Sequence, residues 1–280
     1  MHPTIGVFDS GFGGLTVLKA LLEAIPDAPY LYFGDTARLP YGSKSVETVA
    51  KYACEAARFL EHEGAKLLVI ACNTATALAL DEIRHAASVT VLGVVEPGAQ
   101  RAMAVSKNKR GVVIGTDATI SSHAYQRALA ACGLESWEKA CPLLVPLVEE
   151  GWVDHPVTEQ VARIYLGEAF TDGFRSADVL LLGCTHYPLL KPLLHRIVPP
   201  DVRLVDSAES MALAILNLTV SGTANVGPGQ GTEAWLHEKH APSMDRVRFF
   251  VTDSIEKFRR LGTLFLGQQI SDITHIDLQE

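Results

Sequence analysis

The feature that most constrains the fold of this chain is a strand-and-cysteine segment that occurs twice. Residues 65–74 read AKLLVIACNT and residues 177–186 read ADVLLLGCTH. In both segments an alanine and one charged residue come before a short apolar run, which is followed by a small residue, a cysteine and polar residues. A run that is apolar at every position is typical of a parallel strand buried on both faces. The duplication therefore predicts two similar α/β halves related by a pseudo-twofold axis.

Short apolar runs alternate with amphipathic stretches along the rest of the chain. This alternation predicts mainly parallel sheets joined by right-handed crossovers. We expect strands at residues 5–8, 30–34, 67–71, 91–95, 112–114, 144–145, 179–183 and 203–205. We expect helices at residues 14–25, 45–63, 76–87 and 254–266.

The repeat also predicts how the chain divides into domains. We expect a discontinuous first α/β domain made of residues 1–96 and 207–280, and a second α/β domain made of residues 97–206. The tail after residue 207 returns to the first domain in this scheme. The glycine-rich stretch at residues 222–231 is expected to be a surface loop within that tail.

Composition excludes several classes of protein. The chain has 280 residues, 48% hydrophobic and 20% charged, which are ordinary values for a soluble globular enzyme. Its formal net charge of −8 disfavours a nucleic-acid or anionic-membrane partner. No apolar run approaches the about 18 residues that span a bilayer. The first residues lack the pattern of a signal peptide, so we expect a cytoplasmic protein.

The cysteines predict chemistry at two positions. The five cysteines lack CxxC spacing, so neither a disulfide framework nor a metal site is expected, and Cys54, Cys132 and Cys141 are interpreted as core residues. Cys72 and Cys184 instead follow buried strands, where ligands bind in open α/β sheets. Thiols that approach one carbon from opposite faces can remove a proton on one side and deliver one on the other. This pair therefore predicts a racemase.

Polar side chains at the same strand ends could serve that reaction. Asp9 and His186 are candidates for moving protons to the thiols, although Asp9 could instead cap the following helix. We expect the helix turn after each cysteine to lower its pKa from the usual value of about 8.5. The hydroxyls and amides that could hold substrate carboxylates belong to Ser10, Asn73, Thr74, Thr116 and Thr185.

Two glycine-containing motifs remain. Residues 11–14 read GFGG after a strand, which suggests a dinucleotide fingerprint, but its third glycine is replaced by Thr16. Nucleotide binding is therefore disfavoured. Residues 41–43 precede a helix, where backbone N–H groups are available to a carboxylate.

Five longer segments occur in one order along nearly the whole chain. They are IGVFDSGFGGLT at 5–16, YFGDTARLPYG at 32–42, ACNTA at 71–75, VPLVE at 145–149 and LGCTHYP at 182–188. In these segments the sequence resembles the glutamate racemases of the aspartate/glutamate racemase superfamily.

The resemblance implies a fold and an activity. It implies two pseudo-symmetric flavodoxin-like domains with the active site in the cleft between them. It implies interconversion of L- and D-glutamate without a cofactor or metal, supply of D-glutamate for peptidoglycan, and homodimers. Some relatives are controlled through an N-terminal extension, which we do not expect here because little precedes Ile5.

The resemblance also assigns roles to residues. Cys72 would act on D-glutamate with help from Asp9, and Cys184 on L-glutamate with help from His186 and Glu149. The residues implied to bind substrate are Asp9, Ser10, Tyr41, Gly42, Ser43, Cys72, Asn73, Thr74, Thr116, Cys184, Thr185 and His186.

Some alternatives stay open at this point. The acid could be Glu149 or its neighbour Glu150, and residues 115–119 (GTDAT) depart from the family's Gly-Thr-x-Gly-Thr turn. A racemase of another acidic amino acid, such as aspartate, fits the same chemistry. A two-lobed module that only binds a small molecule fits the fold, but it has no need of paired thiols.

Overall fold

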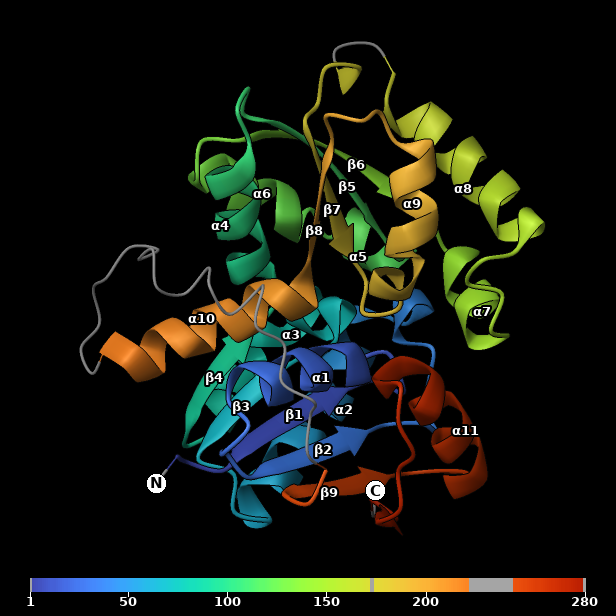
Figure 1. Cartoon of the computed structure of the whole chain (residues 1–280). Helices are drawn as coiled ribbons and strands as arrows, with labels where there is room; N and C mark the ends of the chain where they lie inside the picture. Colours follow the sequence, from blue (N-terminus) through green and yellow to red (C-terminus); the bar gives the residue numbers. More distant parts are fainter. Residues whose placement is uncertain (1, 172–173, 222–243, 279–280) are drawn as a thin grey trace.

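The computed structural model describes residues 2–171, 174–221 and 244–278, and its strands form two sheets (Figure 1). Every strand pairing among these residues is parallel. The six-stranded sheet has the order β10-β9-β2-β1-β3-β4, and the four-stranded sheet has the order β6-β5-β7-β8. We call these sheets, with the helices packed on them, the first half and the second half. The predicted α/β fold with two parallel sheets is confirmed.

The bounds of the strands show how the chain is shared between the halves. The first half contains β1 (Ile5–Asp9), β2 (Tyr30–Gly34), β3 (Leu67–Ile70), β4 (Thr90–Gly93), β9 (Val247–Val251) and β10 (Ile273–His275). The second half contains β5 (Arg110–Gly115), β6 (Glu135–Ala140), β7 (Val179–Gly183) and β8 (Arg203–Asp206). Strand β9 pairs with β2, so the end of the chain completes the sheet that the beginning starts. The domain boundaries at 96/97 and 206/207 stay predictions, and the loop expected at 222–231 lies outside the described residues.

Helices cover both faces of each sheet. The α-helices are α1 (Leu15–Ala24), α2 (Val46–His62), α3 (Asn73–Ala86), α4 (Val95–Val105), α5 (Asp117–Ser121), α6 (Ala124–Ala131), α7 (Leu144–Glu149), α8 (Pro156–Ala169), α9 (Lys191–Ile197), α10 (Ser207–Ser221) and α11 (Ile255–Leu266). The described residues also include the short 3₁₀ helices η1 (Tyr41–Ser43) and η3 (Tyr187–Leu190). In Figure 1, α4 and α6 lie on one side of the upper sheet, and α8 and α9 on the other. None of the described helices is long and apolar enough to span a bilayer.

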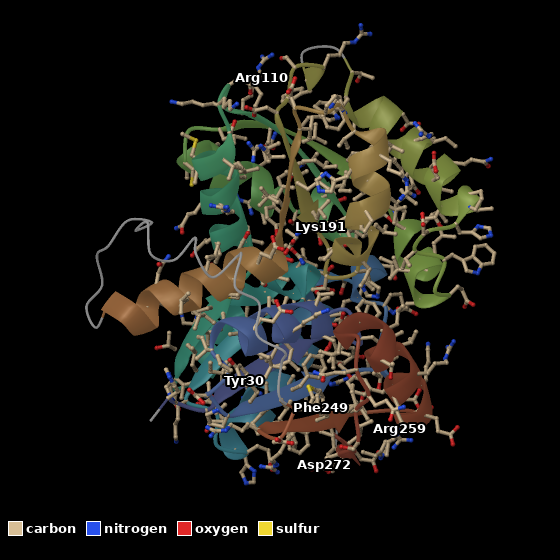
Figure 2. The ribbon with its side chains drawn as sticks, viewed as in Figure 1. Tyr30, Arg110, Lys191, Phe249, Arg259 and Asp272 are labelled. Carbon is tan, nitrogen blue, oxygen red and sulfur yellow. The ribbon has the colours of Figure 1, made fainter. Side chains whose placement is uncertain are left out.

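The two halves share part of their hydrophobic core. One cluster of buried apolar side chains is continuous from Val7 and Leu18 in the first half to Leu182 in the second. Helix α10 packs against both α1 and α4. At its start, Lys191 of the second half forms ion pairs with Asp206 and with Glu209 at 3.0 Å. Figure 2 shows Lys191 near this junction. The junction between the halves is therefore both packed and charged.

Several parts of the predicted secondary structure differ from the structure. The strand expected at 144–145 is wrong: Leu144 and Val148 bury the same side of helix α7. An apolar run of two residues fits either element, and spacing over four residues decides for a helix. The expected strand at 91–95 ends at Gly93, and the expected helix at 76–87 already begins at Asn73. Strands β6, β9 and β10 were not predicted.

Candidate active site

The carboxyl ends of strands from both sheets meet around one small cavity. Its volume is about 50 Å³, which is room for a few water-sized groups. Cys72 of the first half and Cys184 of the second half both line it. The other predicted residues on its wall are Ser10, Tyr41, Gly42, Asn73, Thr74, Thr116, Glu149, Thr185 and His186. Five further lining residues were not predicted: Gly11, Phe12, Leu39, Pro40 and Val145.

Two of the predicted site residues do not line this cavity. Asp9 is completely buried behind it, and Ser43 is exposed in η1. The hydroxyl of Tyr41 also points away, because it donates a 2.5 Å hydrogen bond to Oδ2 of Asp35. Asp35 accepts from Thr252 as well, at 2.9 Å. Tyr41 therefore offers the cavity its ring and backbone, and a role for its hydroxyl on substrate is disfavoured.

Cys72 is the N-cap residue of α3. Its Sγ accepts a hydrogen bond from the backbone N–H of Ala75 at 3.4 Å and donates one to Oγ of Ser10 at 3.4 Å. Burial, followed by the nearby charge of Asp9, raises the pKa of Cys72 to about 12. The expected fall of this pKa is therefore wrong. The N–H groups of α3 do favour the thiolate, but removal of the sulfur from water outweighs them.

Asp9 ends β1 beneath the cavity floor. Its Oδ2 accepts from the backbone N–H of Gly11 at 2.9 Å, whereas its Oδ1 has no hydrogen-bond partner among the described residues. Burial raises the pKa of Asp9, and backbone N–H groups and His186 offset part of that rise. Helix α1 begins at Leu15 with Gly14 as its N-cap, so Asp9 does not cap it. Asp9 is thus a buried acid with one free oxygen near a thiol.

Cys184 belongs to a chain of three polar groups. Its Sγ lies 3.9 Å from Nδ1 of His186, and Nε2 of His186 lies 3.2 Å from Oε1 of Glu149. Burial alone would lower the pKa of His186, but its bonds to Cys184 and Glu149 raise it to about 10. Burial acts to raise the pKa of Glu149, and the bond to His186 nevertheless lowers it. The site therefore holds a protonated His186 between the carboxylate of Glu149 and the sulfur of Cys184.

The structure distinguishes the two adjacent acids. Glu149 lines the cavity and also lies 4.0 Å from Nζ of Lys257 on α11. Glu150 is exposed at the end of α7. The geometry therefore favours Glu149 over Glu150 as the partner of His186.

Threonine hydroxyls from both halves form a cluster at the cavity wall. Thr74 lies 3.0 Å from Thr116 and 3.1 Å from Thr119, measured between hydroxyl oxygens. Thr116 caps α5 by accepting from the N–H of Thr119, despite the departure from the family's turn at these residues. Thr119 was not predicted, although its spacing from Thr116 is that of an N-cap and its partner.

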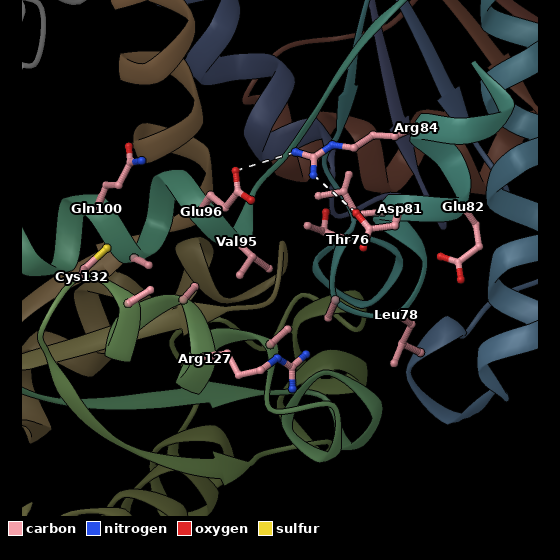
Figure 3. Close-up of a pocket in the computed structure, with 16 residues that line it drawn as sticks. Thr76, Leu78, Asp81, Glu82, Arg84, Val95, Glu96, Gln100, Arg127 and Cys132 are labelled. Atoms are coloured by element: carbon pink, nitrogen blue, oxygen red, sulfur yellow. Dashed lines mark ion pairs between the residues drawn. The ribbon is translucent and has the colours of Figure 1, made fainter. Parts of the chain in front are cut away.

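A larger cavity of about 620 Å³ lies between α3, α4 and α6 (Figure 3). Arg84 crosses it, 3.6 Å from Asp81 and 3.8 Å from Glu96. Its one thiol, Cys132, has no second thiol opposite it in this lining. Volume alone would place the site here, but the paired acid–base groups lie around the smaller cavity.

The sequence matches a known family. The family model described as Asp/Glu/Hydantoin racemase matches residues 5–215 of the sequence. The chain belongs to the Asp/Glu/Hydantoin racemase family. The predicted resemblance to this family is therefore confirmed. Within the family, the chain is similar to several glutamate racemases.

Relatives of this racemase-family chain cover it almost completely. It is 57% identical to a glutamate racemase of Koribacter versatilis, over 99% of this chain and 98% of that protein. A crystal structure of a glutamate racemase isoform from Bacillus anthracis has a TM-score of 0.85 at 36% identity, covering 99% of this chain and 98% of that one. A glutamate racemase from Francisella tularensis in complex with D-glutamate has a TM-score of 0.82 at 34% identity, with 99% and 98% covered.

A more distant racemase shares only the fold. The aspartate racemase of Picrophilus torridus has a TM-score of 0.57 at 18% identity, and it covers 84% of this chain and 99% of its own.

Within the described residues, no group of three His, Cys, Asp or Glu side chains is arranged to hold a metal ion.

Proposed function

We propose that this protein racemises glutamate by passing protons between two cysteines and the α-carbon. The observation that carries the proposal is that Cys72 and Cys184, from opposite halves, line one cavity. The glutamate racemases that resemble the chain over its whole length support glutamate as the substrate. The thiols themselves supply the base and the acid, so the reaction needs neither pyridoxal phosphate nor a metal.

In the direction from L- to D-glutamate, Cys184 is the base. Its thiolate takes the α-hydrogen of the bound substrate as a proton, and the S–H of Cys72 donates a proton to the opposite face of the carbon. The charge of His186, 3.9 Å away, stabilises the thiolate by Coulomb attraction. The raised pKa of Cys72 keeps that thiol protonated, as the acid of this direction requires.

In the reverse direction Cys72 must become the base. Asp9 is the group placed to receive its proton, because Asp9 is buried nearby with Oδ1 unpartnered among the described residues. Cys184 then donates its S–H proton to the carbanion, which completes D- to L-glutamate. Each direction leaves the two thiols in exchanged protonation states.

The remaining wall residues suit a dicarboxylate substrate. Hydroxyls of Ser10, Thr116 and Thr185 and the N-terminal turn of α3 present hydrogen-bond donors to the cavity. Such fixed donors also stabilise charge that develops as the α-hydrogen leaves. In this proposal five residues act in proton transfer: Cys72, Cys184, Asp9, His186 and Glu149. The donors named above bind the substrate, and neither Ser43 nor the hydroxyl of Tyr41 contacts it.

Racemisation of aspartate is the second candidate. The distant aspartate racemase supports it only through the shared fold, since the two sequences are 18% identical. The pure protein, without added cofactor, should abolish the circular dichroism of an L-glutamate solution and leave that of L-aspartate largely unchanged. The reverse preference would replace glutamate by aspartate, and loss of neither signal would leave a binding module.

The cellular role follows from the product. We propose that the protein supplies D-glutamate for peptidoglycan in the cytoplasm and works as a homodimer. Expression in a bacterium that requires D-glutamate should restore growth without it, and light scattering should give twice the chain mass. Failure to restore growth by a protein that is active in the test tube would contradict the cellular role alone.

A further inference from the structure

A buried tyrosine outside the cavity connects the two halves at the site. Tyr125 of α6 is completely buried, and its hydroxyl donates a 2.5 Å hydrogen bond to Oδ1 of Asn73. Asn73 is the residue after Cys72 and lines the cavity, whereas Tyr125 does not. The hydrogen bond therefore runs from the second half to the wall of the site in the first half.

The other end of the Asn73 amide is also held. Its Nδ2 donates to Oγ of Ser207 at 3.2 Å, and Ser207 is a buried residue at the start of α10. Burial, with smaller contributions from Cys184 and Asp206, raises the pKa of Tyr125. The phenol therefore stays protonated and donates a hydrogen bond to Asn73. With a donor on one side and a hydroxyl acceptor on the other, the orientation of the Asn73 amide is fixed.

The ring of Tyr125 packs against the strand that carries the other cysteine. A Cβ added to Gly183, directly before Cys184, would lie 3.0 Å from Cε2 of Tyr125. A Cβ added to Gly98 on α4 would lie 3.3 Å from its Cε1. One side chain thus touches the residue before Cys184 and the residue after Cys72.

We infer that Tyr125 is a positioning residue of the racemase reaction. It affects substrate binding indirectly, because its hydroxyl holds the amide of Asn73. The inference rests on the proposed function, since it assumes that the cavity binds glutamate. Asn73 Nδ2 has a second hydrogen and Oδ1 a second lone pair, and a fixed amide presents them to the substrate in one direction. Asn73 cannot act as an acid or base here, so its displacement weakens binding more than it slows proton transfer.

Tyr125→Phe removes the hydroxyl and keeps the ring. We expect KM for glutamate to rise about three- to tenfold, the effect of one hydrogen bond, while kcat changes by less than about twofold. A purely structural loss would lower the amount of folded enzyme, and hence the apparent kcat, and leave KM unchanged. The matched control is Tyr30→Phe, because the Tyr30 hydroxyl is also buried but donates to the carbonyls of Leu21 and Ile25 in the first half. Figure 2 shows Tyr30 away from the junction. This control should keep the wild-type KM.

Two further variants test the route through Asn73. Ser207→Ala removes the other anchor of the amide and should raise KM similarly, which keeps the test open if Tyr125→Phe does not fold. In an Asn73→Ala background, adding Tyr125→Phe should change KM no further, because the group it holds is gone. Wild-type KM in both Tyr125→Phe and Ser207→Ala, or additive effects in the double variant, would overturn the inference and leave the proposed function standing. A wild-type protein that does not racemise glutamate would overturn both.

Discussion

Glu149 and His186 form a partly buried ion pair on the cavity wall, with 3.2 Å between Oε1 and Nε2. Both residues belong to the second half. Of the two site thiols, Cys184 is the one that His186 contacts, through Nδ1. The two sides of the site are therefore chemically different: an imidazolium lies beside Cys184, and the buried carboxyl group of Asp9 lies near Cys72. We therefore expect substitutions on the two sides to change the rate, the isotope effects and the stability differently.

Replacement of either thiol should stop the reaction. Cys72→Ser and Cys184→Ser should each lower kcat by about a hundredfold or more, since a serine hydroxyl is a far weaker acid than a thiol. Steady-state polarimetry and unfolding curves measure the two effects separately, and Cys54→Ser is the control because Cys54 lies outside the cavity. In deuterated water the product α-carbon should carry deuterium. Near wild-type turnover by either site variant would refute the two-thiol scheme.

Loss of the acid beside His186 should slow one proton transfer. Glu149→Gln removes a charge that raises the pKa of His186, and we expect kcat/KM to fall about tenfold. The fall must be equal in both directions because the enantiomers have equal free energy. The primary deuterium isotope effect should nevertheless grow with L-glutamate labelled at the α-carbon more than with the D-enantiomer.

Glu150→Gln is the matched control for that experiment. Glu150 is exposed and neighbours Glu149 in the sequence, so its replacement should leave the rate and both isotope effects unchanged. An equal loss in the two variants would mean that local charge, and not the contact with His186, sets the rate.

The raised pKa of His186 makes stability depend on pH. Because the pKa is about 10 in the folded protein and about 6.5 in the unfolded chain, the folded state binds the proton more tightly. This stabilisation is complete below pH of about 6.5 and is lost as pH rises through the folded value. The free energy of unfolding, measured in urea, should therefore fall from pH of about 6.5 to 9. His186→Asn should flatten this slope, and an unchanged slope would show that His186 is neutral.

A glycine above Asp9 should prove essential for the position of that acid. A Cβ at Gly14 would lie 2.4 Å from Cβ of Asp9 and 2.8 Å from its Cγ, so Gly14→Ala must displace the carboxyl group. We expect a loss of activity of at least about tenfold, together with a destabilisation of about 1–3 kcal/mol. Racemisation assays and urea unfolding check the two parts.

Gly167→Ala is the matched control on another helix. Nothing lies within 4 Å of a Cβ at Gly167, which is exposed on α8. This change should stabilise the protein by up to about 1 kcal/mol through helix propensity and leave activity unchanged. Full activity of Gly14→Ala would contradict the placement of Asp9 in the reaction.

Sequence patterns predicted the elements whose burial is complete. Strands β1, β2 and β7 are buried at every position, so apart from Asp9 at the end of β1 they contain mostly apolar and aromatic residues and stand out from the neighbouring helices. Strand β6 was missed because it lies at a sheet edge and reads ESWEKA, with charged residues on a half-exposed surface. Strand β10 has three residues, too few for a pattern.

The candidate site was predictable to the extent that its residues follow strand ends. Cys72, Cys184 and their polar neighbours meet because parallel strands end at one edge. Contacts between distant segments were not predictable: Thr252 on Asp35 and Tyr125 on Asn73 join residues with no shared motif. The direction of the pKa shift of Cys72 was also missed, since burial depends on the assembled halves and not on the helix turn alone.

The pairing of β9 with β2 has a consequence for protein synthesis. All four strands of the second half, up to Asp206, leave the ribosome before Val247, the first residue of β9. The sheet whose translation begins first is thus finished last, and until then the edge of β2 offers its backbone N–H and C=O groups to other chains. During synthesis, the edge of β2 must therefore be kept from aggregating until β9 is made, although all strands of the second sheet are already available.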